Sequence, residues 1–179
     1  VLDLARFDSG KVDVDPTEFN LQDMVGKEVM QYQALASSAG LRLGGSSDAE
    51  PIWLRTDRMK LARVLSNLIG NAIKFTDRGG VEVKCSQASD GTVEVHVTDT
   101  GVGIQPTLLE NIFDEFYQIK NPERDRSKGT GLGLAICKRL VDAIGCSLVV
   151  RSRFGEGTTF TIRIPQELVI DSPARVPAR

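Results

Sequence analysis

Several features of other protein classes are missing from this chain of 179 residues. No apolar run approaches the roughly 20 residues that a membrane span needs, and no signal peptide is visible. The three cysteines, Cys85, Cys137 and Cys146, lack the paired spacing of metal ligands, so we expect reduced core residues and a cytoplasmic setting. The 22 basic and 24 acidic residues nearly cancel, with no long basic block. We therefore expect no nucleic-acid partner and no direct membrane contact by this segment.

Histidine and the common nucleotide-binding fingerprints are also scarce. The only histidine, His96, lies between valines in an alternating stretch, which favours a structural role over a phosphoacceptor. No Walker A sequence occurs, and the spacing of the glycines after Lys128 does not fit the dinucleotide fingerprint. The length suits one domain with a well-buried core. Because the first residue is Val, we expect a piece of a larger protein.

The first third of the chain predicts short strands around one helix. Residues 11–15 alternate like an exposed strand that Pro16 ends, and a helical pattern covers 21–39. Short strands are expected near 41–43 and 52–54. Val1 to Phe7 has helix-compatible spacing and is either the end of a helix or a frayed terminus.

The middle and end of the chain predict two further helices and two strand pairs. Asp57 can cap a helix whose apolar stripe is Leu61, Val64, Leu65, Leu68, Ala72 and Ile73. A hairpin follows over 81–85 and 93–97, then a short helix over 106–112 and a polar mobile loop over 118–128. A helix over 132–144 and a final strand pair over 147–150 and 159–164 complete the predicted elements. Strands packed against helices on one side predict an α+β sandwich.

Three polar residues share one face of the helix after Asp57. Asn67, Asn71 and Lys74 fall at i, i+4 and i+7. One interpretation is that an amide oxygen, that of Asn71, binds Mg²⁺ while Lys74 neutralises phosphate charge. The alternative is a solvated helix face.

Two glycine-containing segments suit a ligand site. Asp99 is followed by Gly101 and Gly103, which either brings a carboxylate to a ligand or is an ordinary turn. Gly129-Thr130-Gly131-Leu132-Gly133-Leu134 precedes a helix, where exposed N–H groups and the helix dipole can hold phosphates.

These patterns occur in a fixed order that resembles the N, G1, F and G2 boxes of sensor histidine kinases. The order runs from Asn67 through Asp99-Thr100-Gly101-Val102-Gly103-Ile104 and Phe113-Asp114-Glu115-Phe116 to the glycine-rich segment, and Gly155-Glu156-Gly157-Thr158-Thr159-Phe160 closes it. The resemblance implies the Bergerat fold, a two-layer sandwich of a mixed, mostly antiparallel sheet on about three helices with a mobile ATP lid. It further implies a catalytic domain over 16–165, preceded in 1–15 by the end of a dimerisation helix and a connecting strand. A linker or tail over 166–179 would follow.

The resemblance also implies roles for individual residues. Asn67, Asn71 and Lys74 would be catalytic, and Asn71 would bind Mg²⁺. Asp99 would accept a hydrogen bond from the adenine amino group. Arg126 or Lys128 could reach the γ-phosphate or be solvated, and Thr158 or Thr159 could touch the phosphates or only extend a strand. The expected ATP contacts are Asn71, Lys74, Asp99, Gly101, Gly103, Ile104, Phe116, Arg126, Lys128, Gly129, Thr130, Gly131, Leu132, Gly133, Leu134 and Thr159.

One departure from related ATPases indicates the type of reaction. Topoisomerase, chaperone and mismatch-repair ATPases of this superfamily have a glutamate base where this chain has Asn67, and an amide cannot be a general base. We therefore expect phosphoryl transfer from Mg·ATP to a histidine on a dimerisation domain, with a response-regulator receiver domain as a further partner. The family's phosphoacceptor motif is absent from the chain. The alternative function is a degenerate module that binds nucleotide without kinase activity.

Overall fold

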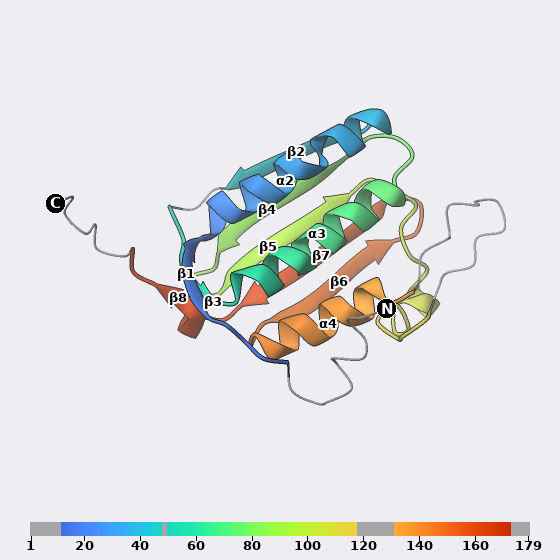
Figure 1. The fold of residues 1–179 in the computed structure, drawn as a ribbon. Helices are drawn as coiled ribbons and strands as arrows, with labels where there is room; N and C mark the ends of the chain where they lie inside the picture. The colour runs from blue at the N-terminus through green and yellow to red at the C-terminus, as the bar shows by residue number, and fades with distance from the viewer. Residues whose placement is uncertain (1–11, 48–49, 118–130, 173–179) are drawn as a thin grey trace.

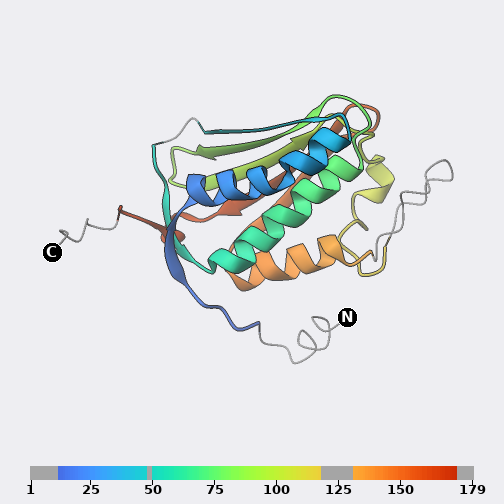
Figure 2. The same cartoon turned by 45° about the horizontal axis from the view of Figure 1, so that its top comes forward.

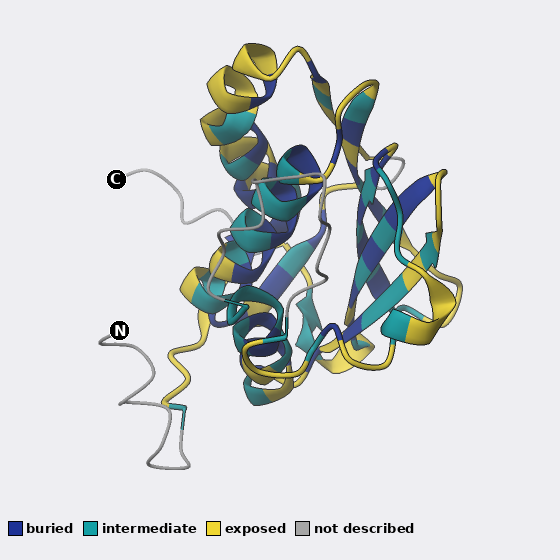
Figure 3. Ribbon diagram, turned by 90° about the vertical axis from the view of Figure 1, so that its right-hand side faces the viewer, coloured by how far each residue is buried: buried dark blue, intermediate teal, exposed yellow. Residues whose placement is uncertain are grey.

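The main body of the protein is a five-stranded sheet with helices on one face only. The computed structural model describes residues 12–47, 50–117 and 131–172. Figure 1 shows the helices crossing the sheet, Figure 2 shows them in front of it after a turn, and Figure 3 shows the two layers from the side. The strand order is β2 (Arg42–Ser47), β4 (Gly80–Gln87), β5 (Val93–Asp99), β7 (Gly157–Ile164) and β6 (Ser147–Arg153). Only β2 and β4 pair in parallel, so the predicted mixed, mostly antiparallel sandwich is confirmed.

The helices are α2 (Leu21–Ser38), α3 (Arg58–Lys74) and α4 (Gly133–Ala143). Asn20 caps α2, because its Oδ1 accepts the Asp23 N–H at 2.9 Å. Asp57 caps α3 as predicted, and its Oδ1 accepts the Lys60 N–H at 2.9 Å. Its Oδ2 accepts the backbone N–H of Asp15 at 3.0 Å, which ties the incoming chain to the start of α3. None of these helices is long and apolar enough to cross a membrane, and the same holds throughout the described part of the chain.

The core lies between the helices and the sheet. All six residues of the predicted α3 stripe are buried, and so is Ile69, which the prediction left out. Complete burial of a side chain such as Leu65 stabilises the fold by about 1.5–3 kcal/mol. All three cysteines are buried thiols. The sheet face away from the helices is polar, and His96 lies there in β5 with Nδ1 3.0 Å from Thr161 Oγ1, in agreement with a structural role.

A second, three-stranded sheet lies at the end of the molecule where α3 begins (Figure 1). It consists of β1 (Thr17–Asn20), β3 (Trp53–Thr56) and β8 (Val169–Ile170). The predicted strand at 11–15 is wrong for its described residues, because pairing starts after Pro16, where Phe19 can be buried. The segment after Gln166, expected to be a linker, forms the 3₁₀ turn η3 (Gln166–Leu168) and then β8.

The segment before the glycine-rich turn differs from its prediction. Of the helix expected over 106–112, only the 3₁₀ turn η1 (Pro106–Leu108) is helical, and the side chain of its N-cap residue Gln105 makes no capping hydrogen bond. Ile112 is buried, and the ring of Phe113 meets that of Phe160 edge to face at 6.5 Å. These contacts hold the base of the expected lid, whereas most of the lid lies outside the described residues.

Candidate functional site

The predicted motifs meet at the end of the molecule opposite the small sheet. The C-terminal half of α3, the end of β5, the start of α4 and the β6–β7 turn all lie there (Figure 1). Hydrogen bonds link them: Asn67 donates to Gly133, Val102 donates to the Phe75 carbonyl, and Thr158 donates to Asp99. The fold therefore brings together residues that are far apart in the sequence.

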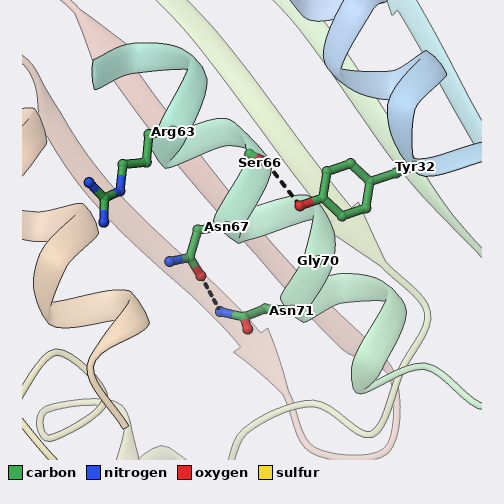
Figure 4. Close-up of a pocket in the computed structure, with 6 residues that line it drawn as sticks. All are labelled: Tyr32, Arg63, Ser66, Asn67, Gly70 and Asn71. Atoms are coloured by element: carbon green, nitrogen blue, oxygen red, sulfur yellow. Dashed lines mark hydrogen bonds between the residues drawn. The ribbon is translucent and has the colours of Figure 1, made fainter. Parts of the chain in front are cut away.

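Two asparagines on α3 form a hydrogen-bonded relay. Asn67 Nδ2 donates to the Gly133 carbonyl at 3.2 Å. Figure 4 shows the second bond, in which Asn71 Nδ2 donates to Asn67 Oδ1 at 3.3 Å. Because a carbonyl only accepts, Gly133 fixes the orientation of the Asn67 amide, which in turn fixes that of Asn71. The relay therefore ends in Asn71 Oδ1, for which no hydrogen bond is found within the described residues. A carbonyl oxygen in this position can bind a cation.

Lys74 lies in the last turn of α3. It follows Asn71 by three residues and is partly buried. Its Nζ lies 5.2 Å from the centre of the Phe75 ring. The predicted face of Asn67, Asn71 and Lys74 is therefore present, with a positive charge at its C-terminal end.

The asparagines also border a hollow on the outside of α3. Its volume is about 380 Å³, and its lining residues are Tyr32, Arg63, Ser66, Asn67, Gly70 and Asn71 (Figure 4). Tyr32 Oη lies 2.9 Å from Ser66 Oγ, which joins α2 to α3. Sequence reasoning missed these neighbours. Ser66 and Gly70 adjoin the motif along α3, but nothing local in the sequence indicates that Tyr32 reaches it.

Asp99 is a buried carboxylate at the end of β5, only 7% exposed. Its Oδ1 accepts the N–H of Gly101 at 2.8 Å and that of Thr158 at 3.3 Å. No bond to Oδ2 is found among the described residues. Burial raises the pKa of Asp99, although the two backbone N–H groups act in the opposite direction. The site thus holds a carboxylate with one oxygen fixed by the backbone and the other available.

The glycines after Asp99 allow close backbone contacts. A Cβ on Gly101 would collide with the Phe75 carbonyl and lie 2.8 Å from Asp99 Oδ1. Gly103 has a φ of +65°, and a Cβ there would overlap the Arg153 carbonyl. The Ile104 N–H donates to Ser152 Oγ at 2.8 Å. These glycines pack the turn against α3 and the β6–β7 turn, so their occurrence has a reason within the protein itself.

Within the described residues, the start of α4 lacks a side-chain cap of the kind that α2 and α3 have. Its N-cap residue is Leu132, which makes no capping side-chain hydrogen bond, and Gly133 and Leu134 form the first turn. Gly131 precedes them with a φ of +69°, and its carbonyl accepts the Phe116 N–H at 3.0 Å. The N–H groups of this turn can therefore bind an anion. Arg126, Lys128, Gly129 and Thr130 lie outside the described residues.

Phe116 and the two threonines complete the predicted set. Phe116 has a φ of +61° and is 67% exposed beside Gly131. Thr159 lies on the sheet face away from the helices, where its Oγ1 is 3.1 Å from Thr98 Oγ1. Thr158 lies on the Asp99 face and is buried. Because strand residues alternate between faces, it is Thr158 and not Thr159 that shares the face of Asp99.

Comparison with known proteins gives a family match over most of this region. The profile of the family described as histidine kinase-, DNA gyrase B-, and HSP90-like ATPase matches residues 56–168. The chain is 35% identical over 166 residues to the sensor histidine kinase RcsC of Escherichia coli (strain K12), covering 92% of this chain and 17% of that protein. It is 33% identical over 165 residues to the histidine protein kinase DivJ of Caulobacter vibrioides, covering 92% of this chain and 28% of that protein. The chain thus spans less than a third of these relatives.

Solved structures show the same fold. Full-length ShkA in complex with AMPPNP superposes with a TM-score of 0.84 at 28% identity, over 97% of this chain and 35% of that one. The catalytic domain of the histidine kinase ThkA superposes with a TM-score of 0.74 at 28% identity, over 85% of this chain and 96% of that one. The second match shows that an architecture of this size has been solved as a separate unit.

Proposed function

Because this chain belongs to the histidine kinase-, DNA gyrase B-, and HSP90-like ATPase family, we propose that it is the ATP-binding catalytic domain of a sensor histidine kinase. It transfers the γ-phosphate of ATP to a histidine on a dimerisation domain. The observation that carries the proposal is the convergence of the buried Asp99 carboxylate, the asparagine relay and the uncapped start of α4 at one end of the sheet. The proposed catalytic unit corresponds to residues 16–165.

Asp99 recognises the adenine ring of the nucleotide. An ionised carboxylate only accepts hydrogen bonds, so its available oxygen suits the amino group of adenine. The carbonyl that guanine has at the same ring position would be repelled. Two backbone N–H groups on Oδ1 hold the carboxylate in place without a flexible partner.

We place the phosphates and a magnesium ion between Asn71 and the start of α4. Mg²⁺ commonly takes one or two protein oxygens together with substrate phosphates and water. Asn71 Oδ1 would supply one such oxygen. When bound, the ion neutralises phosphate charge. Lys74 adds a positive charge, and the first turn of α4 donates N–H groups.

The residues of the site suit transfer better than hydrolysis. Asn67 uses its amide to bond Gly133 and Asn71, and it cannot take a proton from water. Phosphoryl transfer needs positioning and charge neutralisation, which this site supplies, and the acceptor histidine brings its own nucleophile. A response-regulator receiver domain then accepts the phosphoryl group from that histidine. The catalytic domain itself acts in the cytoplasm. ThkA has been solved in complex with its response regulator TrrA.

Calorimetric titration tests the binding step. The chain should bind a non-hydrolysable ATP analogue, and Mg²⁺ should strengthen binding to the parent protein. Asn71→Ala should remove most of this magnesium effect while leaving metal-free binding nearly unchanged. Arg55→Ala on β3, in the small sheet, is the matched control. No binding by the folded parent chain would refute the site.

A transfer assay separates the kinase from the degenerate module. The chain is incubated with γ-labelled ATP and a dimerisation domain that carries the phosphoacceptor histidine. Labelling of that histidine that is lost in Asn71→Ala supports the kinase. Nucleotide binding without labelling supports the regulatory module, and steady phosphate release without an acceptor would contradict the role assigned to Asn67.

A further inference from the structure

One row of side chains across the sheet differs from the rows beside it. On the helix-facing side, Asp99 of β5 is paired with Thr158 of β7, which is paired with Ser152 of β6. The next row on the same face is Val97, Phe160 and Val150. The apolar face that supports the core therefore ends in three adjacent polar side chains. We call Asp99, Thr158 and Ser152 the polar row.

Ser152 makes three hydrogen bonds with one hydroxyl group. Its Oγ accepts the Ile104 N–H at 2.8 Å and lies 2.9 Å from the Gly157 carbonyl and 2.8 Å from Thr158 Oγ1. A carbonyl cannot donate, so the single hydrogen of Ser152 goes to Gly157. A backbone N–H cannot accept, so one lone pair of Ser152 is used by Ile104.

This arrangement determines the direction of the third bond. Ser152 has no second hydrogen, so the bond between the two hydroxyls must be donated by Thr158. The hydrogen of the Thr158 hydroxyl therefore points toward Ser152. On its other side, toward Asp99 and the site, this hydroxyl can then only accept a hydrogen bond. The Asp99 carboxylate, when ionised, also only accepts. The polar row therefore offers acceptors and no side-chain donor.

We propose that Ser152 is a specificity-determining residue for the nucleotide base: it holds the Thr158 hydroxyl as an acceptor, so that the polar row selects a purine with an amino group over one with a carbonyl at the same position. This inference rests on the proposed function, since it concerns the same ATP site. Adenine carries a donor at this position, whereas hypoxanthine and guanine carry an acceptor. A carbonyl at that position faces two acceptors and no donor, and such a mismatch rejects the wrong ligand. Ser152 does this as a positioning residue, through Thr158.

The test compares two nucleotides that differ at this position of the base. Calorimetry gives the Kd of the imido analogue of ATP and that of its hypoxanthine counterpart, and the readout is the ratio of the two. In Ser152→Ala the Thr158 hydrogen is released and can rotate toward a carbonyl. The preference for adenine should then fall by about three- to tenfold, the effect of one neutral hydrogen bond. Ser152→Thr keeps a hydroxyl and should restore the parent ratio.

A double-mutant cycle separates this role from a structural one. In a Thr158→Val background no hydroxyl remains to be oriented, so adding Ser152→Ala should leave the ratio unchanged. Thr158→Val alone should also lower the preference, which tests the inference if Ser152→Ala does not fold. Parallel weakening of both nucleotides in Ser152→Ala, or an equal change in ratio with and without Thr158, would overturn it. Lack of adenine-nucleotide binding by the parent chain would refute the proposed function instead.

Discussion

Asp99→Asn should weaken nucleotide binding while making the folded protein more stable. The carbonyl oxygen of asparagine can still accept the N–H groups of Gly101 and Thr158, so the turn keeps its geometry. The amide nitrogen then occupies the position of Oδ2 and presents hydrogens where the adenine amino group also presents hydrogens. A hydrogen bond to a charged group contributes about 1.5–3 kcal/mol, and 1.4 kcal/mol is tenfold in affinity, so the Kd should rise roughly ten- to a hundredfold.

The gain in stability follows from the pKa of Asp99. Burial raises this pKa above its ordinary value of 3.8, so the folded state holds the proton more tightly than the unfolded state. Stability from this group is fully present below pH 3.8 and is lost as the pH rises through the folded pKa. At pH 7 the buried, ionised carboxylate therefore lowers the stability of the folded state, and the neutral amide of asparagine does not. Tm for Asp99→Asn should exceed that of the parent at pH 7, and the two should converge toward pH 4.

Calorimetric titration and thermal unfolding of the same preparations measure both effects. Asp90→Asn is the matched control, because Asp90 is exposed in the turn at the far end of the β4–β5 hairpin. The N–H of Thr92 and other hydrogen bonds lower the pKa of Asp90, so removing its charge should not stabilise the fold. Parent-like affinity in Asp99→Asn would refute the assignment of Asp99 to the base. Lower stability at pH 7 would refute the argument from burial.

Two further predictions concern packing. Gly103→Ala should lower the free energy of unfolding by more than Gly155→Ala does. Both glycines have a positive φ, which costs about 1–2 kcal/mol for a residue with a side chain, but only at Gly103 would the new Cβ also collide with the Arg153 carbonyl. Chemical denaturation of the two variants measures the difference. Burial raises the pKa of the Cys137 thiol to about 12. A thiol reagent at pH 8 should therefore label Cys137 only as fast as the protein unfolds locally or globally. Labelling at the rate of an exposed cysteine would contradict its burial.

The regular part of the fold could be predicted from local patterns. Asp57 and the apolar stripe define α3 within a residue or two, since a cap and a helical period both act over short distances. Strict alternation with a turn between identified β4 and β5. The strands of the small sheet are different: β1 and β8 each pair with β3 from far away in the sequence. Neither has a pattern of its own, because long-range pairing decides where such short strands form.

For the candidate site, the sequence indicates residue types but little of their arrangement in space. Asn71 and Asp99 are candidates from the sequence because their neighbours form motifs. The choice between Thr158 and Thr159 depends on strand register, which a run of two threonines does not reveal. The Ser152 interactions join β6, β7 and the turn after Asp99, and no local signal in the sequence marks them.

The two backbone hydrogen bonds that the Asp57 carboxylate accepts have a mechanical consequence. One carboxylate holds both the chain at Asp15 and the first turn of α3, and α3 is a continuous helix of 17 residues, roughly 25 Å long, that is stiff along its axis. Asn71 lies near the other end of this rod. A displacement of the chain at Asp15 would act on the first turn of α3, and a shift of this continuous helix along its axis would move Asn71 with it. The point where the preceding chain is attached and the Asn71 amide thus lie at opposite ends of one stiff helix.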